Sequence, residues 1–383
     1  MTSAAQEDPS PAHLGGALPS AVDPGALSLN ESPLPPLPTV RAALADFIGA
    51  ANRYPDFLPI RLRRLVADRA GVGEENVAIG PGASGLAMRL LQAAAAPGQR
   101  IVLSTPTFEG YPAFAQMAGL TVVDVGLDSY GHQDLAAMAR AAEHARVVVL
   151  CRPHNPTGTL ESVADVERLI GSVPTETIVV LDEAYIEFVA PGQRMDVTGL
   201  IQRYPNVIVL RTFSKAYGLA GLRIGYALAA PELAGLLWSM QVPFGISAGC
   251  TVAVAASYAA ESQLEQRIAH VVAERSYLRA RLRACGAYTT DSHANFVYLP
   301  ATDRPWSEVF AETGLRVRSY PDGAVRITVG SRGSTQLVLS AVEQALNAPT
   351  DAPHGQTHSA ERRRRAPQPV GPAATRWPAP DHG

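Results

Sequence analysis

Seven short apolar runs, separated by stretches with a helical pattern, constrain the fold of this chain more than any other feature. Most of the runs are continuous and rich in β-branched residues, as in strands buried on both faces of a parallel sheet. Their alternation with helices predicts an α/β layered domain with a mostly parallel sheet. The predicted strands are Val77–Ile79, Ile101–Leu103, Thr121–Val125, Val147–Leu150, Ile178–Leu181, Val207–Leu210 and Gly225–Leu228, and the predicted helices are 84–96, 109–119, 133–145 and 161–172.

The C-terminal part of the chain predicts a second, smaller α/β unit. A long helical pattern over about 248–283 is followed by strands near 295–299 and 325–329 and by a helix over about 334–346. Both ends of the chain are rich in Pro and Gly and lack apolar periodicity, which is typical of disorder. We therefore expect a flexible arm (1–27), a segment that packs on the small domain (28–50), a large domain (51–245), a small domain (246–347) and a disordered tail (348–383).

Composition narrows the classes of function. The chain is 47% hydrophobic and 17% charged, which suffices for a sizeable core, and its net charge of −3 gives no electrostatic argument for nucleic-acid binding. No stretch of about 18 apolar residues lacks a charge or a breaker, so we expect no membrane span. The N-terminus does not resemble a signal peptide, and three cysteines without a CxxC pair indicate a reducing compartment. We expect a cytoplasmic protein without a metal site.

Lys215 is the only lysine among 383 residues. Arginine does not deprotonate in proteins, whereas a lysine amine can lose its proton and attack a carbonyl to form a Schiff base. A coding bias toward arginine explains why other lysines are absent, but it does not explain the position of this one. Lys215 follows the apolar run Val207–Leu210 and lies in a turn rich in hydroxyl groups and glycine. This position favours a reactive amine.

Polar residues follow most of the predicted strands. In open α/β sheets, ligands bind beyond the carboxyl ends of the strands. Taken singly, each group has an ordinary structural explanation as a turn, a helix cap or a packed aromatic ring. The groups are Gly80–Gly85 after the first strand, Thr105–Phe108 after the second, His154–Gly158 after the fourth, Asp182–Tyr185 after the fifth, and Thr212, Ser214 and Lys215 after the sixth.

Together these groups resemble the fold-type I pyridoxal-phosphate aminotransferases, and the histidinol-phosphate aminotransferase branch in particular. The similarity covers about residues 28–347 in family order, and its long motif around Lys215 is specific. The phrases that match are Arg53–Asp56, Asn155–Gly158, Asp182–Phe188, Arg211–Arg223 and Val325–Gly330.

The resemblance implies a role for each matching residue. Lys215 would bind pyridoxal 5'-phosphate as a Schiff base and move a proton, Asp182 would pair with the pyridine nitrogen, and Tyr185 with Asn155 would hydrogen-bond the ring hydroxyl. An arginine fork at Arg326 would bind the substrate carboxylate. The other implied cofactor contacts are Phe108 on the ring face, Ala83, Ser84, Thr212, Ser214 and Arg223 on the phosphate, and Tyr54 from a neighbouring subunit of a homodimer; the other implied substrate contacts are Asn30 and Arg318.

The sequence departs from this branch mainly on the substrate side. No tyrosine precedes Tyr54, although these enzymes usually carry an N-terminal tyrosine that meets the substrate phosphate. Arg318 falls where the branch has a phosphate-binding arginine, but a solvated arginine at a strand end is an equal alternative. The resemblance therefore predicts amino transfer between a small amino donor and a 2-oxo acid such as 2-oxoglutarate, with histidinol phosphate as the first candidate donor.

Three other functions remain open. The donor is alternatively another, aromatic amino acid of secondary metabolism, or the same scaffold serves a lyase or decarboxylase such as a phosphothreonine decarboxylase. Aminotransferase-like domains also occur as ligand sensors in transcription regulators, behind a DNA-binding helix-turn-helix. Residues 1–27 are too short and too rich in Pro for such a module, which argues against the sensor.

Overall fold

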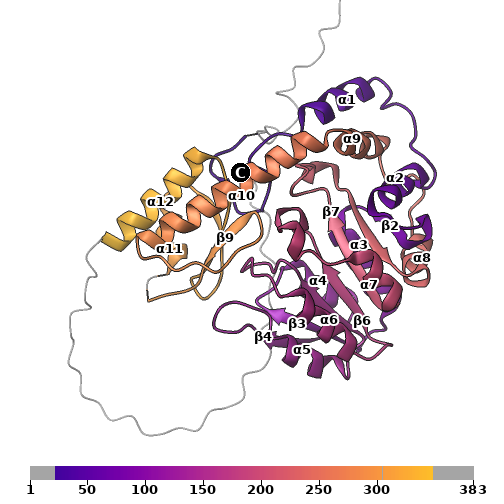
Figure 1. The fold of residues 1–383 in the computed structure, drawn as a ribbon, viewed down its shortest axis with the longest axis horizontal. Helices are drawn as coiled ribbons and strands as arrows, with labels where there is room; N and C mark the ends of the chain where they lie inside the picture. Colours follow the sequence, from indigo (N-terminus) through magenta and orange to yellow (C-terminus); the bar gives the residue numbers. More distant parts are fainter. Residues whose placement is uncertain (1–21, 304, 348–383) are drawn as a thin grey trace, which may run out of the picture. The chain divides into compact units, whose positions relative to one another are not determined.

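The computed structural model describes residues 22–303 and 305–347, which belong to one compact unit. Two sheets organise these residues (Figure 1). The larger has seven strands in the order β2-β8-β7-β6-β5-β3-β4, and all seven predicted strands are confirmed in it. Its strands are β2 (Val77–Gly80), β3 (Arg100–Thr105), β4 (Thr121–Gly126), β5 (Val147–Cys151), β6 (Ile178–Asp182), β7 (Val207–Thr212) and β8 (Gly225–Ala229).

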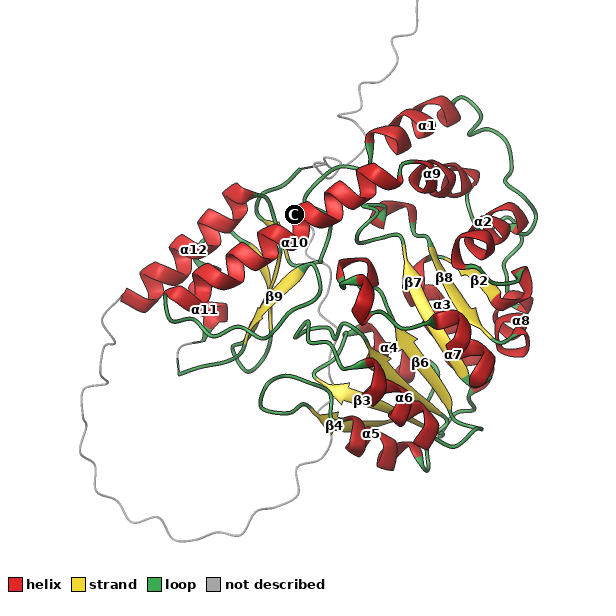
Figure 2. Ribbon diagram, in the orientation of Figure 1, coloured by secondary structure: helices red, strands yellow, loops and turns green. Residues whose placement is uncertain are grey.

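The large sheet is covered by helices on both faces, as Figure 2 shows. Alternate residues of one strand enter two different cores: Val148 of β5 packs with Val166 and Leu200, whereas Val149 packs with Leu86 and Leu233. Burial on both faces explains why the strands are continuously apolar. The first core includes α2 (Ile60–Ala70), α5 (Leu135–Ala142), α6 (Val163–Ser172) and α7 (Val197–Arg203), and the second includes α3 (Gly82–Ala94), α4 (Gly110–Met117) and α8 (Pro231–Ser239).

The direction of the strands brings the predicted site residues to one edge of the large sheet. β3, β4, β5, β6 and β7 pair in parallel, and only β8 runs antiparallel to its neighbours β7 and β2. The prediction of a mostly parallel sheet is therefore confirmed. The loops that follow β3, β5, β6 and β7 all leave from the same edge, which is where ligands collect in such sheets.

The smaller sheet has the order β1-β10-β11-β9 and forms its own core with three helices. Leu278, Phe310 and Val338 of these helices pack on Val297 and Ile327 of the sheet. The strands are β1 (Ala26–Leu27), β9 (Phe296–Leu299), β10 (Arg316–Ser319) and β11 (Val325–Thr328), and the helices are α10 (Glu261–Ala284), α11 (Trp306–Ala311) and α12 (Arg332–Asn347).

Two boundaries differ from the sequence-based predictions. Ala26–Leu27, which we assigned to the arm, form β1 and pair in parallel with β10, and Leu27 is buried. The pattern over 248–283 is two helices, α9 (Ala248–Ala259) and α10, interrupted at Ala260 without a glycine or proline. Strand β1 depends on its tertiary pairing with β10. The predicted tail lies outside the described residues, and the division into a large and a small domain stays a prediction.

The N-terminal segment packs along both parts of the chain. Asn30 contacts the small sheet, because its backbone N–H donates to Thr328 Oγ1 at 3.0 Å. Further along, α1 (Pro38–Ile48) packs against α9, and Figure 1 shows the two helices side by side. None of the helices in the described residues has the length and apolarity needed to cross a membrane.

Candidate active site

A cavity of about 350 Å³ opens at the edge of the large sheet where the parallel strands end. It is lined by residues from the loops after β3, β5, β6 and β7, from the first turn of α3, and from the N-terminal segment. Ten of the fourteen predicted site residues line it: Ala83, Ser84, Phe108, Asn155, Asp182, Tyr185, Thr212, Ser214, Lys215 and Arg223. The parallel register of the strands thus brings together residues that are 140 positions apart.

The amine of Lys215 is poised for nucleophilic attack. Burial lowers its pKa to about 8, and the positive charges of Arg326 and Arg223 contribute in the same direction. Burial is the largest cause of this shift, and Arg326 contributes more to it than Arg223. Nζ donates a hydrogen bond of 2.8 Å to the carbonyl oxygen of Leu29 and lies 5.9 Å from the centre of the Tyr185 ring. A substantial neutral fraction near pH 8 is what Schiff-base chemistry requires.

Asp182 ends β6 and is held from two sides. Oδ1 accepts the backbone N–H of Ala184 at 3.0 Å, and Oδ2 accepts the hydroxyl of Tyr111 at 2.6 Å. Burial raises the pKa of Asp182, and the hydrogen bond from Tyr111 opposes that shift. Sequence reasoning missed Tyr111. Tyr111 lies one turn beyond Phe108, at the start of the helix that follows β3. This position near the end of a strand is the sequence feature that could have indicated its role.

The hydroxyl of Tyr185 accepts hydrogen bonds from two side-chain amides. Asn30 Nδ2 donates to it at 3.0 Å and Asn155 Nδ2 at 3.3 Å. Burial raises the pKa of Tyr185 to about 12, so the phenol stays protonated. Asn30 is buried, has a positive φ of 54°, and also receives the Thr328 hydroxyl at 3.3 Å. Asn30 therefore connects the N-terminal segment, the large sheet and the small sheet.

Arg326 reaches the site from β11 of the small sheet. Nη1 donates to Asn155 Oδ1 at 2.6 Å and Nη2 to the carbonyl oxygen of Ser28 at 2.5 Å. The residue is 4% exposed, and its Nε is buried without a partner among the described residues. No carboxylate of the described chain pairs with it. A buried guanidinium that lacks a counter-ion suits an anionic ligand.

The start of α3 forms an anion-binding cradle with Arg223. No side chain caps this helix, and its first turn carries no acidic residue, so its first backbone N–H groups remain available. Gly82 has φ 79°, and a Cβ there would lie 2.5 Å from Arg223 Nη2. Thr212 donates to Ser214 at 2.9 Å, and Arg223 Nη1 lies 3.4 Å from the same Ser214 hydroxyl. These donors fit the phosphate of pyridoxal phosphate.

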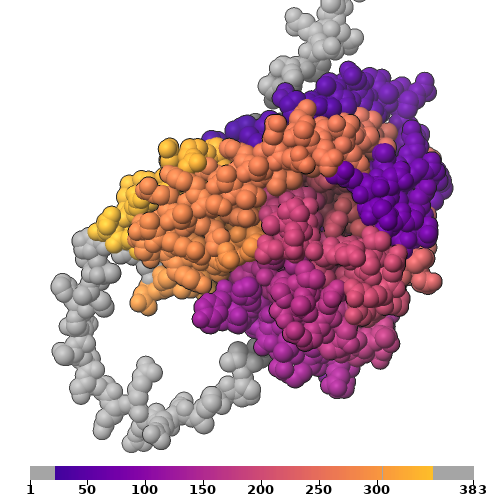
Figure 3. All heavy atoms as spheres, viewed as in Figure 1, coloured from indigo at the N-terminus to yellow at the C-terminus, as the bar shows by residue number. Residues whose placement is uncertain are grey.

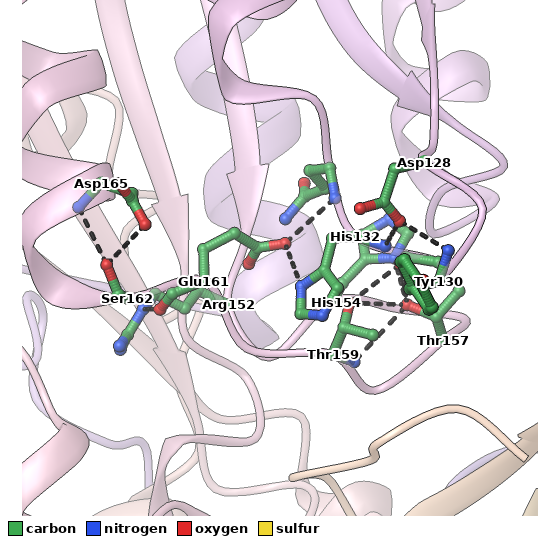
Figure 4. A network of polar contacts seen from close by, with 12 residues as sticks. Asp128, Tyr130, His132, Arg152, His154, Thr157, Thr159, Glu161, Ser162 and Asp165 are labelled. Atoms are coloured by element: carbon green, nitrogen blue, oxygen red, sulfur yellow. Dashed lines mark hydrogen bonds and ion pairs between the residues drawn. The ribbon is translucent and has the colours of Figure 1, made fainter.

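A polar network outside the cavity fixes the loop that carries Asn155 (Figure 4). His154 is fully buried, which lowers its pKa to about 4 and keeps it neutral, and its Nδ1 lies 2.8 Å from Thr157 Oγ1. The hydroxyls of Thr157 and Thr159 both donate to the carbonyl oxygen of Gly131, at 2.8 and 2.9 Å. The loop is therefore anchored before any ligand arrives, which limits the motion of Asn155.

Two predicted residues lie apart from the cavity. Tyr54 is 84% exposed, and its ring centre lies 5.0 Å from that of Phe244. Its expected contact with a phosphate in a neighbouring subunit stays a prediction. Arg318, on β10, donates from Nε to Glu109 Oε1 at 2.8 Å and forms an ion pair with that half-exposed carboxylate. The candidate phosphate-binding arginine is therefore already paired.

Comparison with known proteins agrees with this geometry. The family described as aminotransferase class I and II matches residues 24–344. Aromatic amino acid aminotransferases of Rhodococcus jostii (strain RHA1) and Rhodococcus opacus (strain B4) are 42% and 43% identical, covering 83% and 80% of this chain and 89% and 87% of those proteins. The structure of histidinol-phosphate aminotransferase from Sinorhizobium meliloti in complex with pyridoxal-5'-phosphate superposes with a TM-score of 0.78 at 28% identity, covering 84% of this chain and 90% of that one. The chain belongs to the class I and II aminotransferases, which use pyridoxal phosphate.

Proposed function

We propose that this aminotransferase moves the amino group of an aromatic L-amino acid to a 2-oxo acid such as 2-oxoglutarate. The pairing of Arg318 with Glu109 is the observation that carries the choice of substrate. A phosphorylated side chain would have to compete with the Glu109 carboxylate and would meet its negative charge. An uncharged aromatic side chain meets neither obstacle. The names of the Rhodococcus relatives, at 42% and 43% identity, support the same substrate class.

The lining of the cavity also suits an aromatic side chain. Beside Phe108, whose ring the resemblance assigns to the cofactor, Phe114 contributes a second aromatic ring, and Leu29 and Ala87 add aliphatic surface. Burying a large ring against such walls contributes roughly 25 cal/mol per Å² of apolar surface removed from water. This gain is available to phenylalanine or tyrosine without any further charged group.

The chemistry follows from the groups that surround the cavity. When bound, pyridoxal phosphate supplies an electron sink that stabilises negative charge at the substrate Cα. Lys215 Nζ, with a pKa of about 8, is the group that would carry the proton between the substrate Cα and C4′ of the cofactor. Asp182, fixed by Tyr111 and by the N–H of Ala184, would present its carboxylate to the ring nitrogen of the cofactor and keep that nitrogen protonated.

Arg326 binds and orients the substrate carboxylate. Its guanidinium already lies beside Asn155 and has a donor without a partner, so a carboxylate gains charge-assisted hydrogen bonds there. Fixing the carboxylate orients the Cα–H bond relative to Lys215. Leu29 and Asn30 lie over the same region from the N-terminal segment and help to exclude water.

A substrate panel tests the proposal. Holoenzyme is supplied with 2-oxoglutarate and with phenylalanine, tyrosine, histidine or histidinol phosphate, and the glutamate formed is measured. We expect kcat/KM for phenylalanine or tyrosine to exceed that for histidinol phosphate at least tenfold. A higher value for histidinol phosphate overturns the choice of substrate, and release of carbon dioxide without glutamate overturns amino transfer itself.

Histidinol phosphate is the second candidate substrate. The likeness to the Sinorhizobium enzyme, at 28% identity, favours it. Replacement Arg318→Met discriminates between the two. It lowers kcat/KM for histidinol phosphate alone if Arg318 binds the phosphate, and leaves both activities within about twofold if the pair with Glu109 is only a surface contact.

We further propose a homodimer in the cytoplasm. Tyr54, Phe57 and Phe244 form an exposed aromatic cluster, with ring centres 5.0 and 5.2 Å apart. Exposed clusters of this kind typically mark protein–protein contacts. Light scattering on the purified protein should give twice the chain mass, and Phe244→Asp should lower that mass. A monomer at micromolar concentration contradicts the proposal.

A further inference from the structure

One charged residue of the active-site cavity has no part in the chemistry described so far. Among the described residues, the charged side chains that line this cavity are Glu31, Asp182, Lys215 and Arg223. The resemblance assigns the last three to the ring nitrogen, the Schiff base and the phosphate of the cofactor. Glu31 has no such assignment, and its carboxylate has no hydrogen-bond or ion-pair partner among the described residues. Its charge is therefore directed at whatever else enters the cavity.

The backbone is anchored on both sides of Glu31. Directly before it, the carbonyl oxygen of Asn30 accepts a hydrogen bond of 3.0 Å from Asn295 Nδ2. Four residues after it, the carbonyl oxygen of Pro35 accepts a hydrogen bond from Arg267 of α10. Figure 3 shows the indigo atoms of this N-terminal segment lying against the orange atoms of the C-terminal part. These contacts hold Glu31 at the wall of the cavity.

The negative charge of Glu31 reaches the position of the reacting amine. Burial is the main cause of the lowered pKa of Lys215, and Glu31 opposes that shift more strongly than Asp182 does. Like charges repel one another over such distances, and the repulsion is stronger beside a low-dielectric wall than in bulk water. A substrate that reacts at Lys215 therefore lies within the field of Glu31.

The arginines nearest to the substrate carboxylate leave no free positive charge for a second anionic group. Arg326 binds the first carboxylate in the proposed reaction. Arg318 is directly opposite Arg326 in the pairing of β10 with β11, but it already forms an ion pair with Glu109. A carboxylate or phosphate on the substrate side chain would meet the charge of Glu31 without compensation, whereas an uncharged ring would not.

We propose that Glu31 is a specificity-determining residue, which favours substrates with an uncharged side chain by repelling a second negative charge. The proposal rests on amino transfer in this cavity and deepens the proposed function by naming a residue that selects the side chain. The same repulsion acts on 2-oxoglutarate, whose second carboxylate should raise its KM. Because Glu31 is exposed, water and salt screen its charge, so we expect effects of about tenfold rather than complete exclusion.

Binding of two unreactive ligands tests the proposal. 3-Phenylpropanoate and glutarate carry the side chains of phenylalanine and glutamate but no amino group, so neither forms a Schiff base with the cofactor. Each is titrated by calorimetry into holoenzyme of the wild type, Glu31→Gln and Glu143→Gln. Glu143 is the matched control because it is also an exposed glutamate, follows the last residue of α5, and does not line the cavity. The two variants have the same net charge, so a difference between them reports the position of the charge.

We expect Glu31→Gln to lower the dissociation constant of glutarate about tenfold and that of 3-phenylpropanoate less than threefold, because Arg326 neutralises the single carboxylate of the latter. The gain for glutarate should shrink as the salt concentration rises. Glu143→Gln should change neither constant more than twofold. An affinity for glutarate that is equal in Glu31→Gln and in the wild type overturns the proposal, and so does an equal gain for both ligands.

The wild-type protein separates this inference from the choice of substrate. Tighter binding of glutarate than of 3-phenylpropanoate to the wild type contradicts the aromatic substrate class, whereas the effect of Glu31→Gln on glutarate still decides the role of Glu31. Steady-state kinetics give a second readout. In Glu31→Gln the KM for 2-oxoglutarate should fall while kcat with phenylalanine stays within about twofold, a combination that a loss of structure would not produce. An unchanged KM for 2-oxoglutarate contradicts the proposal.

Discussion

Arg326 donates a hydrogen bond of 2.6 Å to Asn155, so the small sheet and the loop after β5 of the large sheet meet at one pair of side chains. The pair places the predicted carboxylate-binding group directly beside a predicted ring-binding group. Asn155 is itself anchored through the network around His154, Thr157 and Gly131. The guanidinium of Arg326 is therefore positioned from both sides before a substrate binds.

Replacement Arg326→Lys tests this arrangement. A lysine keeps the charge but offers no planar fork, so it cannot bind a carboxylate and Asn155 Oδ1 in the same geometry. Loss of one charge-assisted hydrogen bond, worth about 1.5–3 kcal/mol, should lower kcat/KM for the amino donor about ten- to hundredfold. Steady-state kinetics measure the effect, with Arg332→Lys on the surface of α12 as control. Unchanged kcat/KM would remove Arg326 from the substrate site.

Replacement Tyr111→Phe tests the support of Asp182. The hydrogen bond from Tyr111 lowers the pKa of Asp182, so its loss should raise that pKa further. The acid limb of the kcat/KM profile should then move to higher pH. The carboxylate oxygen left without a partner should lower the free energy of unfolding by about 1–3 kcal/mol. Replacement Tyr204→Phe, on the half-buried Tyr204 away from the site, is the control; an acid limb that stays in place contradicts this role of Tyr111.

The large sheet could be predicted from sequence because burial on both faces leaves a direct pattern. Val148 and Val149 enter opposite cores, so β5 has no polar face and appears as a continuous apolar run. Strand β10 gives no such pattern, since Arg316 and Arg318 alternate with less polar residues on an exposed strand. Its partner β1 is only two residues long. Neither strand is predictable without the tertiary pairing that forms it.

The candidate site, like the fold, could be predicted only in part from the sequence. Residues that follow apolar runs, such as Asp182 and Lys215, were found because each strand end predicts a position at the sheet edge. The role of Tyr111 was not predicted because this residue lies on a helix, where a tyrosine ordinarily indicates packing. The ion pair of Arg318 was not predicted because its partner Glu109 is 209 residues away in the sequence. Contacts across such separations depend on the assembled fold rather than on local pattern.

The pH dependence of cofactor capture tests the lowered pKa of Lys215. Attack on the aldehyde requires the neutral amine, whose fraction rises with pH up to the pKa of about 8 and is nearly constant above it. The rate at which cofactor-free protein takes up pyridoxal phosphate should therefore rise about tenfold per pH unit below pH 8 and then level off. The amine of N-acetyl-lysine amide, with a pKa of about 10.4, is the control and should keep rising to pH 10. A profile that matches the control contradicts the burial argument.

Reduction with borohydride tests the site of cofactor attachment. Because Lys215 is the only lysine, one peptide alone should gain the mass of the reduced cofactor. Peptide mass spectrometry of the reduced holoenzyme locates the modification. Replacement Lys215→Ala should abolish it and lower amino transfer by several orders of magnitude while the melting temperature stays close to that of the wild type. Modification of any other residue, or retained activity of this variant, excludes Lys215 as the reacting amine.

Replacement Gly82→Ala tests the phosphate cradle. A methyl group at this position would lie 2.5 Å from Arg223 Nη2, and the backbone has φ 79°, where a residue other than glycine costs about 1–2 kcal/mol. Arg223 must then move away from the start of α3, so the dissociation constant of pyridoxal phosphate should rise at least tenfold and the melting temperature should fall. Gly235→Ala in α8 is the matched control, because a Cβ there meets no atom within 4 Å and should stabilise the helix by roughly 0.5–1 kcal/mol. Equal cofactor affinity in the two variants would show that the cradle does not hold the phosphate.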